Sequence, residues 1–161
     1  MRLQSRDGHF AELDVTAYES SRGPSTSHEV DWDANWLMIR GKVWDGSKSW
    51  EFHDPCMTTW EARELATWLR GLGSAHPDTT AAADPAEVRL WLTEPNLMFT
   101  LAATSAGMTT LDVFFDAESQ PPHGSNDHER LGHRLRLTIP QAEIAAAVSE
   151  WEHALVAYPP R

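Results

Sequence analysis

The densest group of residues that could carry out a reaction lies in the segment "WEFHDPCMTTWEARE", residues 50–64. It contains Cys56, the only cysteine of the chain, preceded closely by His53 and Asp54. A cysteine nucleophile needs a histidine base within hydrogen-bond reach and a third group that orients this base. In an extended segment, however, neighbouring side chains point to alternate faces, and Pro55 bends the chain before the thiol. We therefore expect Cys56 to be a small buried side chain and not a nucleophile.

Three histidines in a polar stretch, His123, His128 and His133, are the best candidates for binding a metal. Their spacing of five residues matches neither a helical ligand pair nor a zinc-finger pattern. Carboxylate pairs are common in an acidic chain, and no pair stands out as a glycosidase pair would. The motifs of phosphate loops, serine hydrolases, zinc proteases and dithiol enzymes are absent from the sequence. The sequence thus predicts no enzyme, no metal and no cofactor.

Tryptophan is concentrated in the first half of the chain, which holds six of the eight. Alternation along residues 35–44 places Trp36 and Trp44 opposite the apolar positions, so both are expected to face outward. Such a row on a sheet is either covered by another element or is a binding surface. We predict that Trp36, Trp44 and the nearby Trp50 bind a partner, because tryptophan is enriched at interface hot spots. The alternative is that they form a second small core beneath the polar loop 19–34.

The first half of the chain predicts a strand at residues 9–15 and then a β-hairpin. The hairpin turn is "DGSK", since Asp-Gly is a strong turn signal, and Trp44 and Trp50 on either side of it are expected to form a cross-strand pair. A helix follows at residues 58–73. Its start has the pattern of a capping box, in which Thr58 and Glu61 satisfy free backbone N–H groups.

The second half predicts four strands and a helix that begins at Pro140 and runs to about Val156. A long polar loop, residues 117–133, precedes the last strand. Hairpin connections dominate, so the expected fold class is α+β: an antiparallel β-sheet of about seven strands with two amphipathic helices packed on one face. We expect residues 1–161 to form a single domain. Each half runs through strands into a helix, although no sequence repeat is evident. The four strands are expected at residues 87–93, 97–103, 110–115 and 134–139.

The formal net charge of −11, from 24 acidic and 13 basic residues, limits the possible partners. An acidic surface repels phosphate backbones, so nucleic acid is an unfavourable partner, whereas a basic protein would be captured faster. The alternative is that the charge only maintains solubility. The first ten residues lack a signal-peptide core, and no apolar run is long enough to span a membrane. We therefore expect a cytoplasmic protein with no membrane contact.

Several short motifs resemble those of one family of small bacterial proteins. They are "DANWL", "WEFHDPCMTTWEARELATWL", "EPNLMFTL" and a closing "LRLTI" strand before a helix that ends at "YP". In this order, over about residues 30–159, they are similar to the WapI-like immunity proteins of polymorphic toxin systems. The resemblance implies a cytoplasmic protein, without catalytic residues, that binds and blocks a toxin domain, often a nuclease, delivered by a neighbouring cell. The acidic surface would suit a basic nuclease domain.

Two other functions follow from the residues alone. Outward tryptophans could stack on the rings of a sugar or another small molecule, which would make the chain a small-molecule or carbohydrate-binding module. The other is a hydrolase whose motif is not recognised. Both differ from the immunity-protein hypothesis in needing no protein partner.

Overall fold

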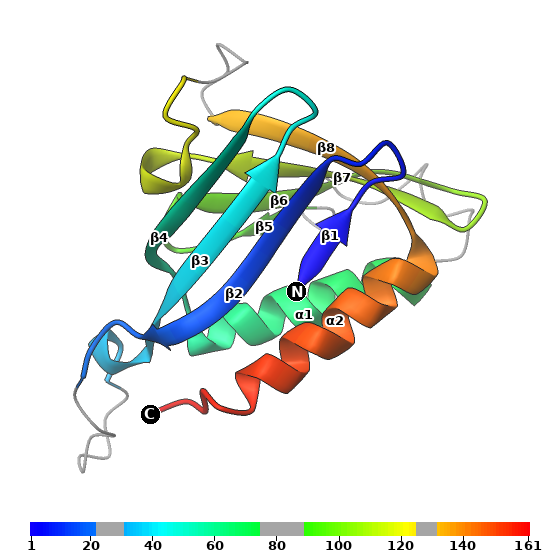
Figure 1. Cartoon of the computed structure of the whole chain (residues 1–161). Helices are drawn as coiled ribbons and strands as arrows, with labels where there is room; N and C mark the ends of the chain where they lie inside the picture. Colours follow the sequence, from blue (N-terminus) through cyan, green and yellow to red (C-terminus); the bar gives the residue numbers. More distant parts are fainter. Residues whose placement is uncertain (22–30, 75–88, 125–131) are drawn as a thin grey trace.

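The two halves of the chain have the same order of elements, four strands followed by one helix (Figure 1). The computed structural model describes residues 1–21, 31–74, 89–124 and 132–161. The first half contains β1 (Arg2–Gln4), β2 (Phe10–Tyr18), η1 (Asp33–Asn35), β3 (Trp36–Trp44), β4 (Ser49–Thr58) and α1 (Thr59–Ser74). The second contains β5 (Arg89–Trp91), β6 (Leu97–Ser105), β7 (Met108–Phe115), η3 (Ala117–Ser119), β8 (His133–Pro140) and α2 (Gln141–Leu155).

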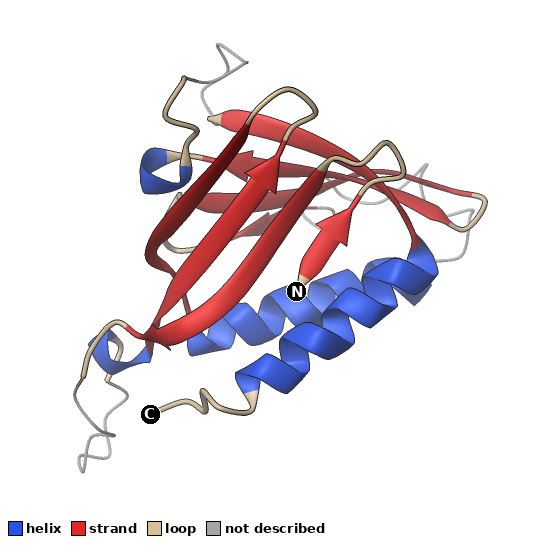
Figure 2. Cartoon of the chain, viewed as in Figure 1, coloured by secondary structure: helices blue, strands red, loops and turns tan. Residues whose placement is uncertain are grey.

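The strands form two antiparallel sheets, ordered β1-β2-β3-β4 and β5-β6-β7-β8. The α+β class and its two helices are confirmed, but the expectation of one sheet with about seven strands is wrong. Both sheets contribute their apolar face to one core, and the two helices lie side by side below them (Figure 2). At one corner the sheets touch, where Ser5 Oγ accepts from the Thr138 N–H at 3.0 Å. The strand β1 was not predicted, since three residues carry too little periodicity.

Buried side chains from both sheets and both helices form a single hydrophobic cluster. Between the sheets, the ring of Phe115 contacts Trp50 at 5.4 Å and Phe52 at 6.1 Å, measured between ring centroids. Between the helices, the buried Trp151 donates its indole N–H to the carbonyl of Ala62 at 2.8 Å. This common core supports the prediction of a single domain, which stays a prediction.

The two helices begin differently. At α1 the predicted capping box is confirmed, because a carboxylate oxygen of Glu61 accepts from the Thr58 N–H at 2.8 Å and Thr58 Oγ1 accepts from the Glu61 N–H at 3.3 Å. At α2 the chain enters through Pro140 without a side-chain cap. Instead, the Gln141 N–H donates to the carbonyl of Gly107 in the β6–β7 turn at 2.9 Å.

The β3–β4 hairpin is present with its predicted faces, but the predicted pair of tryptophans is wrong. The register opposes Trp44 to Ser49 and Trp50 to Val43, so the two rings lie on opposite faces of the sheet. The turn is held by Asp45, whose Oδ1 accepts from the backbone N–H groups of the two residues before β4. A shift of one residue in the pairing of two strands moves a side chain to the other face of the sheet.

Among the described residues, neither helix combines the length and apolar character that crossing a lipid bilayer would require.

Candidate partner-binding site

An acidic groove of about 260 Å³ lies where β4, at the edge of the first sheet, approaches the β5–β6 turn. Both halves of the chain contribute to it. None of the described lining residues is basic, and four are carboxylic acids. We call this surface the acidic groove; it is lined by Glu19, Trp36, Asp54, Pro55, Glu94, Asn96 and Glu118.

The buried amide of Asn96 holds the two halves of the groove together. Its Nδ2 donates to a carboxylate oxygen of Asp54 at 2.9 Å, across from β4. The backbone carbonyl of Asn96 accepts from the Asp116 N–H at 3.0 Å and from the Ser119 hydroxyl, which fixes η3. The 3-10 helix η3 in turn carries Glu118 to the rim. The "EPN" segment, which interrupts the strand pattern, thus forms the turn between β5 and β6 and links this turn to β4 and η3.

Two carboxylates of the groove, Asp54 and Glu118, repel each other. Partial burial raises the pKa of Asp54, repulsion from Glu118 raises it further, and the hydrogen bond from Asn96 acts in the opposite direction. Glu19, Glu94 and Glu118 are exposed, and none forms an ion pair among the described residues. A positively charged group placed here would relieve this repulsion.

A second depression, of about 440 Å³, lies next to the acidic groove. The neighbouring residues Thr93 and Glu94 line the second depression and the groove, respectively. Three tryptophans line the second depression: Trp32 is 63% exposed, Trp91 is 56% exposed and Trp60 is half-buried. We call this surface the tryptophan pocket; its other lining residues are Thr58, Glu61, Glu64, Leu92 and Thr93. Sequence reasoning did not select these tryptophans, although Trp91 alternates with the inward Leu90 and Leu92.

The three predicted partner-binding tryptophans have different surroundings. Trp36 is half-buried and lines the acidic groove. Trp44 is half-buried on the outer face of the first sheet, opposite Phe10 and Ser49, and lines neither the groove nor the tryptophan pocket. Trp50 is only 4% exposed, and its indole N–H donates to the Ser119 carbonyl at 2.9 Å. Partner binding by these residues stays a prediction, which Trp36 is best placed to fulfil.

The reactive residues of the opening segment do not converge. Cys56 is fully buried, as expected, and burial raises the pKa of its thiol to about 12. His53 lies on the outer face, with Nε2 2.8 Å from the Thr16 hydroxyl. Asp54 turns instead toward Asn96. The alternation of side chains along β4 places His53 on the opposite side from Asp54 and Cys56, and the amide of Asn96 contacts both of these.

Only two of the three candidate metal-binding histidines lie in the described part of the chain, since His128 falls outside it. His123 and His133 have ring centroids 6.5 Å apart. His133 is buried, with Nε2 3.6 Å from a carboxylate oxygen of Asp45. Within the described ranges no three His, Cys, Asp or Glu side chains are grouped as a metal ion would require.

The outer face of the first sheet has a depression of about 240 Å³, similar in size to the acidic groove. Here, however, the register places opposite charges side by side. We call this surface the charge ladder; its side chains are Arg2, Glu12, Asp14, Arg40, Lys42 and Glu51. The ion pairs are Arg2–Glu12 at 3.1 Å, Arg40–Asp14 at 2.8 Å and Lys42–Glu51 at 3.6 Å.

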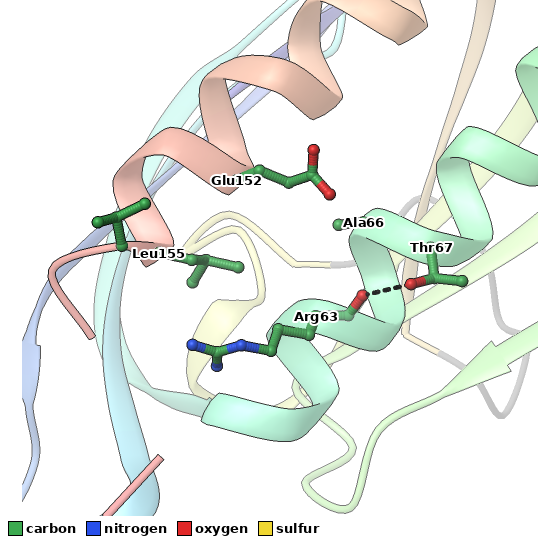
Figure 3. Close-up of a pocket in the computed structure, with 6 residues that line it drawn as sticks. Arg63, Ala66, Thr67, Glu152 and Leu155 are labelled. Atoms are coloured by element: carbon green, nitrogen blue, oxygen red, sulfur yellow. Dashed lines mark hydrogen bonds between the residues drawn. The ribbon is translucent and has the colours of Figure 1, made fainter. Parts of the chain in front are cut away.

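A further groove of about 380 Å³ lies between the helices, where Arg63 and Thr67 of α1 face Glu152 and Leu155 of α2 (Figure 3). Its charges are already engaged. The Arg63 guanidinium donates to the carbonyls of Thr59 at 2.6 Å and Tyr158 at 3.1 Å, which ties the C-terminal segment to α1. Glu152 pairs with Arg70. This groove therefore offers a partner less unpaired charge than the acidic groove does.

In the described part of the chain, two antiparallel sheets and two helices define an α+β protein, and none of the described residues that line its acidic groove is basic. The chain belongs to the immunity protein WapI-like family, whose sequence pattern matches residues 2–159 of its 161. The resemblance noted in the sequence is thereby confirmed. Comparisons with curated proteins and with solved structures gave no match.

Proposed function

We propose that this protein is a non-enzymatic immunity protein that acts in the cytoplasm, where it binds the toxin domain of a polymorphic toxin and blocks its activity. Membership of the immunity protein WapI-like family supports the general function. The observation that carries the choice of partner is the acidic groove, whose four carboxylates lack bound cations among the described residues. The partner is a basic domain, and a nuclease is the kind of toxin that fits best.

The physical argument rests on what a nuclease must bind. Its substrate is a polyanion, so its active-site surface carries a positive potential. A groove of unpaired carboxylates presents the complementary potential and competes for that surface. Such complementarity accelerates association and opposes incorrect partners. Trp36 at the edge of the groove supplies the apolar contact that a stable interface needs.

The test is co-expression in bacteria with candidate basic toxin domains of polymorphic toxins, starting with any that is encoded next to this chain's gene. The toxin domain alone should stop growth, and co-expression of this chain should restore it. A purified complex should weaken as salt rises from 50 to about 500 mM, because screening reduces the charge interaction. Continued growth arrest, with both proteins folded and abundant, would contradict the proposal.

A small-molecule or carbohydrate-binding module is the second candidate, favoured only by the exposed Trp32 and Trp91. Stacking of a sugar on these rings would change tryptophan fluorescence without a dependence on salt. A panel of neutral sugars titrated into the protein separates the two functions. We expect no saturable change below about millimolar sugar, which corresponds to the weak affinity of an incidental contact.

A further inference from the structure

We propose that the tryptophan pocket receives the guanidinium group of an arginine from the bound toxin domain. The inference rests on the proposed function, and it assigns a specific subsite beside the acidic groove. Tryptophan is the best aromatic partner for a cation, and the planar guanidinium both stacks on its ring and donates hydrogen bonds to carboxylates. The pocket combines both requirements, because three tryptophans and two glutamates line it.

The rings of the three tryptophans line the pocket, and two of them are exposed to solvent. Trp32 and Trp60 meet edge to face, with ring centroids 4.9 Å apart and planes inclined at 60°. Trp91 approaches from β5 in the other half of the chain. Trp32 and Trp91 are the two aromatic residues that stand out as exposed in the described part of the chain. Their exposure costs hydrophobic free energy, which a bound partner would recover.

Hydrogen bonds hold the segments that carry these rings. Asn35 is buried; its Oδ1 accepts from the Thr59 hydroxyl at 2.9 Å and its Nδ2 donates to the Asp31 carbonyl at 2.7 Å. These bonds tie the Trp32 segment to the start of α1. The second carboxylate oxygen of Glu61 accepts from the Thr93 N–H, which ties α1 to the chain after Trp91. The pocket is therefore built before a partner arrives, and this lowers the entropic cost of binding.

Glu64 supplies the charge. It lies one helical turn after Trp60 on the same side of α1, is exposed, and has no ion pair among the described residues. None of the described residues that line the pocket is basic. The chain already uses the same interaction elsewhere: guanidinium carbons lie over aromatic rings at 3.7 Å for Arg2 on Phe10 and 3.4 Å for Arg161 on Tyr18.

Trp91 also has a guanidinium of its own chain nearby, since Cζ of Arg89 lies 5.1 Å from its ring centroid. At this distance the guanidinium lies within the range of a cation–π contact. Arg89 is not among the lining residues of the pocket, so the volume bounded by Trp32, Trp60 and Glu64 is open to a second guanidinium.

A direct test uses N-acetyl-arginine amide as the probe and N-acetyl-citrulline amide as its neutral analogue of the same shape. Indole N–H signals in NMR spectra report each tryptophan separately. We expect the arginine probe to shift the signals of Trp32, Trp60 and Trp91 saturably, and to leave Trp44 unchanged. Glu64→Gln should weaken this binding. Equal shifts with the citrulline probe, or none with either, would overturn the assignment.

The second measurement is the affinity of the purified toxin domain for matched variants. Trp32→Leu and Trp91→Leu keep an apolar side chain but remove the aromatic face, and each should weaken binding by about tenfold to thirtyfold. The control is Trp44→Leu, which lies outside both the acidic groove and the tryptophan pocket and should change the affinity by less than about threefold. Thermal melts should match the wild type, because both pocket rings are exposed.

The outcomes separate this inference from the proposed function. If wild-type protein neutralises the toxin and both leucine variants bind it as tightly as the wild type, the arginine subsite is wrong and the proposed function stands. If the wild-type protein does not bind the toxin domain, the proposed function fails, and with it the assignment of the subsite to a toxin arginine.

Discussion

The acidic groove and the charge ladder share strands β3 and β4, but they differ in whether their charges have partners. The ladder pairs its charges within the sheet at 2.8–3.6 Å, because the antiparallel register sets Arg and Lys opposite Asp and Glu. The groove gathers carboxylates from both halves of the chain without a cation among its described lining residues. Of two depressions of similar volume, one therefore has balanced charges and the other is acidic.

This difference indicates that the charge ladder contributes to the folded structure, whereas the acidic groove is the better candidate for binding a partner. Paired surface charges contribute little to binding, because a partner would have to replace bonds that already exist. In the groove, partial burial and repulsion from Glu118 raise the pKa of Asp54, so its negative charge raises the energy of the free protein. Proteins commonly retain such destabilising groups where they are needed for function.

Among the single substitutions, removal of the tryptophan at the groove should have the largest effect on partner binding. Trp36→Ala is expected to weaken binding of the toxin domain by about 2 kcal/mol, the loss typical of an interface hot spot. Trp44→Ala, at the other end of the same strand and outside the groove, is the control and should leave the affinity within about threefold. Calorimetric titration of both variants measures the difference; equal losses would assign binding to the whole outer face of β3.

Loss of the N-terminal cap of α1 should destabilise the folded protein. Glu61→Ala removes the capping bond to Thr58 and the bond to the Thr93 N–H, and should lower the free energy of unfolding by about 1–2 kcal/mol. Glu143→Ala, in the first turn of α2, where no side-chain cap is present, should cost much less. Urea denaturation of the two variants measures this, and similar losses would contradict the role of the cap.

Neutralising one groove carboxylate should stabilise the free protein and weaken the complex. The raised pKa of Asp54 means that the folded state holds the proton more tightly than the unfolded state, so its charge costs stability once the pH exceeds the ordinary value of 3.8. Asp54→Asn should therefore raise Tm at pH 7. This gain should disappear as the pH falls below about 3.8, where both states are protonated. A lower Tm at pH 7 would show that the carboxylate is stabilising.

The smallest effect is expected on the ladder. Glu51→Gln removes one exposed ion pair, with Lys42, and should change Tm by no more than about 2 °C. Affinity for the toxin domain should stay at the wild-type value. A clear loss of affinity would mean that the ladder contacts the partner.

Local features of the fold could be predicted from sequence, because neighbouring residues determine them. The hairpin at "DGSK", the alternating faces of β3 and the Thr58–Glu61 cap are examples. The division into two sheets could not be predicted, since each strand's pattern states only which face is apolar and not which sheet it joins. Trp50 illustrates the same limit: its burial depends on Phe115 and on the carbonyl of Ser119, both distant in sequence.

The candidate site was predicted only in part. Trp36 was selected because outward tryptophans are unusual, and it lines the groove. The carboxylates around it come from separate segments that meet only in the fold. Trp91 had a readable signal, since it alternates with the inward Leu90 and Leu92, but it lies outside the cluster of six tryptophans in the first half, from which the predicted residues came.

The most direct test compares two double charge reversals that alter the net charge equally. Glu94→Lys with Glu118→Lys changes the acidic groove, and Glu12→Lys with Glu51→Lys changes the ladder. Circular dichroism confirms that both fold, and calorimetric titration gives their dissociation constants for the toxin domain. We predict that the groove variant binds at least about a hundredfold more weakly, whereas the ladder variant stays within about threefold of the wild type. Equal losses would show that only the overall charge matters and would contradict the assignment of the groove as the partner-binding surface.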